Sequence, residues 1–209
     1  AALTTTQIPV LTDMHLFSFT SAQVGALTTA QIGALGSVQA AALSPAGMAG
    51  LGTAATVALS TAQVGALGSA QVAGFTTAAI AAMETADVAS LSSLAVAGLT
   101  AAQTVALTTA QVAALGTAQI AGLSLTSVSK LETADIVALG SANITALTTS
   151  QMAGLTSTQV GALSTEQISA LSSAQVSGLT AGALGGLGTA AAVALTTAQA
   201  SALSSSQVS

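Results

Sequence analysis

The chain lacks most of the residues that carry chemistry in proteins. Among its 209 residues there is no cysteine, tryptophan or tyrosine, one histidine, and one basic residue, Lys130. Without cysteine there are neither disulfides nor thiolate metal sites. A single cation cannot neutralise phosphates, which excludes nucleic-acid binding and argues against a basic helix on an anionic membrane surface.

Charge and long apolar runs are also scarce. Charged residues make up 3% of the chain, and the net charge is only −5. Self-repulsion is therefore small, so copies of the chain associate easily. Hydrophobic residues reach 52%, but Thr, Ser or Gln interrupts every stretch well short of the ~20 residues that cross a bilayer. We expect no transmembrane span.

What the chain has instead is an eight-residue repeat. Stepping by eight from Leu3 meets 26 positions, of which 23 are Leu, two Phe and one Met. With this residue as position 0 of an octad, every Gln falls at position 4, and Val or Ile fills position 5 in 17 octads. Position 7 is small except at Val10 and Lys130. The consensus is Leu-Thr-Thr-Ala-Gln-Val-Ala-Ala, as in residues 107–114.

This period predicts short helices that restart in every octad. One straight helix would rotate each Leu by ~80° from the last, and a plain strand would send Leu and Val to opposite faces. The pattern Ser/Thr-x-x-Gln is instead a capping box, with position 1 as the N-cap and Gln at the third helical residue reaching back to the N-cap amide. Leu at position 0 and Val at position 5 then pair as a hydrophobic staple.

Exceptional residues support the same register. Pro45 falls at the first helical position, where proline is favoured. Asp87 and Asp135 replace Gln, and a carboxylate there still accepts amide hydrogen bonds. Glu84 and Glu132 are poor N-caps, so we expect the helix start to slip by one residue in their octads.

Helices this short are unstable alone and must stack. We predict an all-α repeat solenoid of very short capped helices, one per octad, in which small residues at positions 6 and 7 let backbones approach closely. The pattern leaves the number of octads per turn open. The alternative fold is a β-solenoid or cross-β fibre, since an even period keeps a strand face in register and Thr and Val suit strands.

The pattern is least regular near the start of the chain. Residues 1–20 are interpreted as an irregular capping or docking segment that retains the octad phase, and residues 21–209 as a continuous octapeptide-repeat solenoid. The first segment holds three candidates for an intersubunit contact, His15, Phe17 and Phe19. It has neither the orienting framework of a catalytic site nor enough ligands for a metal. We expect no enzyme activity, no cofactor and no metal.

Two further features bear on assembly. Lys130 lies near Glu132, which indicates a surface ion pair, with an intersubunit role as the alternative. The first and last residues fall at the same octad position, and neither end carries a polar cap of the kind that keeps solenoids soluble. We expect either end-to-end or side-by-side assembly of copies, or a continuing polypeptide.

The octad in residues 107–114 resembles the octapeptide arrays of long exported bacterial surface and adhesion-type proteins. The resemblance implies a secreted or cell-surface polymer and carries over no functional residue. Together with the composition, it predicts a structural protein that self-associates into an extracellular filament, matrix fibre or surface stalk. The alternative function is an adhesin or ligand-binding stalk that presents a binding surface.

Overall fold

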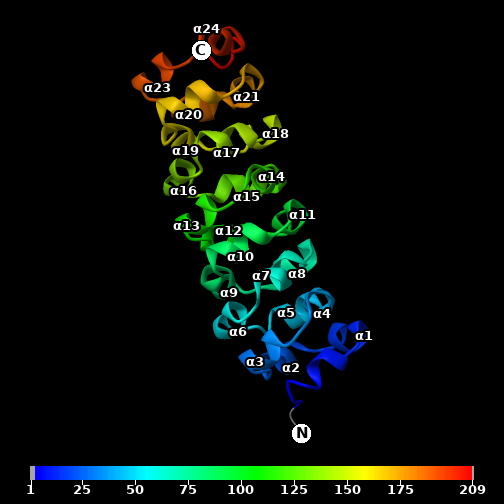
Figure 1. Cartoon of the computed structure of the whole chain (residues 1–209). Helices are drawn as coiled ribbons and strands as arrows, with labels where there is room; N and C mark the ends of the chain where they lie inside the picture. The colour runs from blue at the N-terminus through cyan, green and yellow to red at the C-terminus, as the bar shows by residue number, and fades with distance from the viewer. Residues whose placement is uncertain (1–2, 209) are drawn as a thin grey trace. The chain divides into compact units, whose positions relative to one another are not determined.

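The computed structural model describes residues 3–208 and forms one short helix in almost every octad (Figure 1). Over these residues there is no strand, so the β-solenoid alternative is wrong and the all-α prediction is confirmed. The described chain divides into two compact units, residues 3–114 and 115–208.

The first unit contains a 3-10 helix and thirteen α-helices. Their bounds are η1 (Ile8–Val10), α1 (Asp13–Phe17), α2 (Ser21–Gly25), α3 (Thr29–Gly33), α4 (Ser37–Ala42), α5 (Pro45–Met48), α6 (Thr53–Val57), α7 (Thr61–Gly65), α8 (Ser69–Gly74), α9 (Thr77–Ala82), α10 (Thr85–Ser90), α11 (Ser93–Val96), α12 (Ala101–Ala106) and α13 (Thr109–Ala113).

The second unit continues the same pattern with eleven α-helices in its described part. Their bounds are α14 (Thr117–Gly122), α15 (Leu125–Lys130), α16 (Thr133–Ala138), α17 (Gly140–Ala146), α18 (Thr149–Met152), α19 (Ser157–Gly161), α20 (Thr165–Ala170), α21 (Ser173–Gly178), α22 (Ala181–Leu184), α23 (Thr189–Val193) and α24 (Thr197–Ser201).

Almost every α-helix starts at the residue that the capping box predicts. In α13 the N-cap Thr108 has extended backbone angles, and its hydroxyl accepts a hydrogen bond from the Gln111 amide at 3.2 Å. The Gln111 side-chain oxygen accepts in turn from the Thr108 amide at 2.7 Å. Where the N-cap is glycine, as at Gly36, only the Gln half of the box forms. A complete box, as in α13, thus gives hydrogen-bond partners to two backbone amides at the helix start that would otherwise be unpaired.

The exceptional octads test the predicted register. Pro45 is the first residue of α5, as predicted. The prediction of a slipped start at Glu84 and Glu132 is wrong, because both occupy the N-cap of a helix that begins at the next residue. At Glu132 the Asp135 carboxylate accepts the N-cap amide at 3.0 Å, which holds the start in place.

The start slips at Gly140 instead. This glycine has a positive φ of 67°, and α17 begins with it, one octad position earlier than the other helices. A left-handed backbone angle costs glycine little, whereas a residue with a Cβ is strained there. The octad has Asn143 at position 4, whose side chain is one carbon shorter than that of Gln, and no side-chain cap bond starts this helix.

Within each unit the solenoid takes three octads per turn. Helices three apart in the order pack against one another, as α4 with α7 and α7 with α10 in the first unit, and α18 with α21 in the second. A full turn therefore uses 24 residues of chain. The aliphatic residues of positions 0 and 5 form the core of each turn, and Leu43, Val64 and Ile120 are fully buried.

Small residues at position 7 let successive turns approach closely, as predicted. A Cβ added at Gly50, Gly98 or Gly186 would lie within about 2 Å of a backbone oxygen one turn earlier (2.1, 2.1 and 1.9 Å). All three octads lack Gln at position 4. In two octads that do have Gln, those of Gly74 and Gly178, the same distance is longer, at 2.4 and 2.9 Å. Turns thus come closest where no Gln side chain lies between them.

Candidate functional site

The most regular polar feature of the molecule is the Gln side chain at position 4. Besides closing its own capping box, Gln111 donates its side-chain amide to the carbonyl oxygens of Ile80, at 2.8 Å, and Met83, at 2.7 Å. These acceptors lie 31 and 28 residues earlier. One buried side chain therefore caps its own helix and joins it to the preceding turn.

The same bonds recur in both units. In the first unit Gln63 reaches Ile32 and Leu35, and in the second unit Gln159 reaches Val128 and Leu131, at 2.7 to 2.9 Å. The acceptors lie near the end of one helix and just before the next, where carbonyls lack the usual amide four residues on. The first acceptor of each pair also accepts a local amide, as Ile80 does from Met83 at 3.2 Å. We call the series of these bonds the amide ladder.

The sequence interpretation gave Gln only the capping role and missed its bonds to the preceding turn. A signal was present, because a capping box accepts Glu as readily as Gln, yet no octad has Glu at position 4. A carboxylate closes the box but cannot donate to a carbonyl. Only an amide performs both tasks.

Substitutions at position 4 interrupt the ladder in a graded way. Asn143 keeps one bond to the preceding turn, from its amide to the Leu115 carbonyl at 2.8 Å. Asp135 keeps the capping bond to Glu132. Ala79 has neither group, although it is fully buried.

The three predicted contact residues near the start of the chain have different surroundings. His15 is exposed and occupies position 4 of its octad, where its Nδ1 accepts the Thr12 amide at 3.3 Å, so it takes the capping role of Gln. Phe19 is half-buried at position 0, in line with the core residues. Phe17 is 64% exposed. His15 and Phe17 are therefore exposed on α1, whereas Phe19 lies partly in the core.

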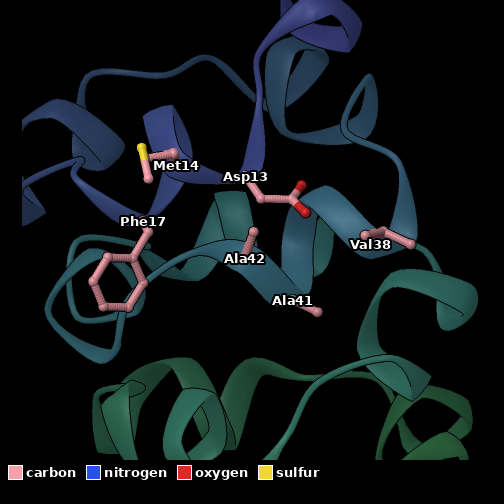
Figure 2. Close-up of a pocket in the computed structure, with 6 residues that line it drawn as sticks. All are labelled: Asp13, Met14, Phe17, Val38, Ala41 and Ala42. Carbon is pink, nitrogen blue, oxygen red and sulfur yellow. The ribbon is translucent and has the colours of Figure 1, made fainter.

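Phe17 lines an open groove between α1 and α4 (Figure 2). These helices are neighbours in successive turns. The groove has a volume of about 620 Å³, and it is lined by Asp13, Met14, Phe17, Val38, Ala41 and Ala42. Met14 and Val38 are 82% and 67% exposed, and Asp13 is the one charged residue of the lining.

Other kinds of site are not seen over residues 3–208. No three His, Asp or Glu side chains lie together as a metal would require. None of the helices in this range has the length and apolar character needed to cross a membrane.

Comparison with known proteins identifies the repeat. A family model described as the ALTTAQ repeat matches residues 15–45, 40–77, 80–117 and 128–165, which together span about two thirds of the chain. No curated protein matches the chain.

Proposed function

Because the chain belongs to the ALTTAQ repeat family, we propose that it is a structural repeat protein that self-associates into an extracellular filament, matrix fibre or surface stalk. The observation that carries the proposal is the amide ladder. Gln side chains in both units make the same hydrogen bonds with the preceding turn, so the structure extends by repetition, and repeat arrays of this kind function mostly through length and surface.

The composition supports association between copies. The net charge of −5 over 209 residues supplies little repulsion, and the large apolar side chains of Val10 and Met14 are at least three-quarters exposed. A location outside the cell is supported by the resemblance to exported octapeptide arrays. It is also supported by the single basic residue, which leaves a trypsin-like protease one cleavage site.

A second candidate function is a stalk that presents a ligand-binding or adhesive surface. One observation favours it, namely the apolar groove between α1 and α4, because exposed apolar patches mark interaction sites. A different molecule in the groove would support this function, and a second copy of the chain would support the first.

Sedimentation velocity over a wide range of protein concentration, combined with negative-stain electron microscopy of the same samples, tests the proposal. We expect the mean sedimentation coefficient to rise with concentration and rods or fibres to be visible. Particles that remain monomeric at every concentration would contradict a self-associating filament.

A further inference from the structure

The groove between α1 and α4 is built from departures from the repeat. Position 3 of the octad is small or polar almost everywhere, and only Met14, Val38 and Leu94 place large apolar side chains there. Position 6 carries an aromatic residue only at Phe17. Two neighbouring turns thus add apolar bulk at the same place on the outside of the solenoid, where the core gains nothing from it.

The lining defines the chemistry of what binds there. Five of its six residues are apolar, and Asp13, which lies between Met14 and Val38 in the view of Figure 2, supplies one negative charge. A fitting group has an aliphatic stem and a positive end. A lysine side chain meets this description, since its methylenes pack along apolar surface while the ammonium remains at a polar edge. The exposed ring of Phe17 adds an attraction for a cation over its face.

The chain contains one such group. Lys130 is the only basic side chain among 209 residues, and it lies exposed at the last residue of α15. It occupies position 7, where, apart from Val10, the other octads have Ala, Gly or Ser. Lys130 is therefore, like the groove residues, an exposed residue that differs from the octad consensus. Its positive charge is opposite to that of Asp13 in the groove.

We propose that the groove between α1 and α4 receives the Lys130 side chain of a second copy of this chain. This inference rests on the proposed self-association and names its contact. The groove and Lys130 belong to different parts of the chain, so the contact is heterologous: each copy offers a free groove and a free lysine to further copies. Contacts of this type build rings or open filaments rather than closed two-fold dimers.

Charge reversal tests the pairing. Asp13→Lys puts two positive groups into the contact, and Lys130→Asp puts in two negative ones. Each single variant should weaken association at least about fivefold, since the loss of an exposed ion pair alone is worth up to about that factor. An equimolar mixture of the two variants restores opposite charges at every contact. The mixture should therefore associate as the unchanged chain does, as should the double variant D13K/K130D.

Glu166→Lys is the matched control, because it makes the same change of charge at an exposed residue of α20 outside the groove. Circular dichroism of each variant confirms that its helices remain, and sedimentation velocity measures association. Phe17→Ala tests the apolar part of the contact and should also weaken association, whereas Val193→Ala, at an exposed residue of α23, should not.

The outcomes separate the two proposals. Association of the unchanged chain that neither charge variant alters, or that E166K alters as much, overturns the groove contact and leaves the filament proposal standing. Weakened single variants that the mixture does not rescue also overturn it, since pairing of opposite charges is its defining feature. Absence of association in the unchanged chain contradicts the filament proposal itself.

Discussion

At the scale of the residue, the structure depends on an amide that has two partners. The side chain of Gln111 is 1% exposed and makes three side-chain hydrogen bonds, one in its own capping box and two to the preceding turn. An amide suits this place because it offers an acceptor and two donors on one short planar group.

Gln111→Ala and Gln111→Glu should separate the two roles. Alanine removes all three bonds and leaves buried backbone groups unpaired, so we expect a loss of about 2–4 kcal/mol of stability. Glutamate keeps the capping bond but directs a carboxylate at the Ile80 and Met83 carbonyls, so Q111E should be destabilised at least as much. Urea unfolding followed by circular dichroism gives both values.

Gln23→Ala is the control for this comparison. Gln23 occupies the same octad position but is exposed, and its side chain bonds only within its own capping box, to Thr20. We expect it to cost no more than about 1 kcal/mol, the typical value of a cap. Equal effects at positions 23 and 111 would mean that the bonds between turns contribute nothing.

Neighbouring threonines provide a second test at this scale. Thr108 is an N-cap whose hydroxyl accepts the Gln111 amide, whereas Thr109 is the first residue of α13 and is exposed. Thr108→Ala should cost about 1 kcal/mol, and Thr109→Ala should stay within about 0.5 kcal/mol of the unchanged chain. Thermal unfolding of the two variants makes the comparison, and a larger effect of T109A would show that the cap is misassigned.

At the scale of the element, neighbouring turns pack by close approach of their backbones. In the octad that contains α22, a Cβ at Gly186 would lie 1.9 Å from the Ser157 carbonyl oxygen, whereas one at Gly182 would meet nothing within 4 Å. We therefore expect Gly→Ala to have opposite effects on stability at these two positions, four residues apart.

Gly186→Ala forces α22 and α19 apart, and we expect it to destabilise the chain by about 1–3 kcal/mol, as overpacking does. Gly182→Ala lies inside a helix with free space around it and should stabilise by about 0.5–1 kcal/mol, because alanine loses less backbone entropy. Denaturant midpoints of the two variants measure the difference in sign. A stabilising G186A would contradict the close packing of these helices.

The elements also show how far the sequence alone leads. The spacing of hydroxyl residues, Gln and Leu predicts where each helix starts and which octad positions are buried. It does so because capping is local and needs only a few neighbouring residues. The bonds between turns connect residues 28 and 31 apart, so no local pattern reveals how many octads make a turn. The early start of α17 at Gly140 was missed because this glycine occupies the same octad position as the glycine N-caps. Those, such as Gly36, keep extended backbone angles.

The sequence did not predict the groove. Phe17 was a contact candidate because it lies in the irregular residues 1–20, but Val38, on the next turn, resembles an ordinary conservative change within its octad. Val38 lines the same groove as Met14 and Phe17 only because one turn takes three octads, which places α4 beside α1. His15 was a candidate for the opposite reason, since a lone histidine stands out in the sequence although here it replaces a capping Gln.

At the scale of the whole molecule, quasi-equivalent octads imply that whole repeats are interchangeable. Deleting residues 59–66 removes one octad and keeps the phase, so that Gln71 meets the carbonyls that Gln63 meets in the unchanged chain. We expect this variant to remain helical, with a modest fall in melting temperature, as repeat arrays lose stability in steps.

Deleting residues 63–66 instead removes half an octad and places Leu where Gln is required. We expect this shorter deletion to be far more disruptive than the longer one, with a large loss of helical circular dichroism and of cooperative melting. Equal tolerance of the two deletions would contradict a solenoid held in phase by its octads.

The central claim is that three octads make one turn, and cysteine pairs test it most directly because the chain has no cysteine of its own. A Cβ at Gly65 would lie 3.8 Å from that of Ser90, which matches the mean Cβ separation in disulfides. The double variant G65C/S90C should therefore form an intramolecular disulfide on mild oxidation, whereas G65C/A82C and G65C/A97C, which correspond to two and four octads per turn, should not. A disulfide in either of those two variants, without one between residues 65 and 90, would contradict the account.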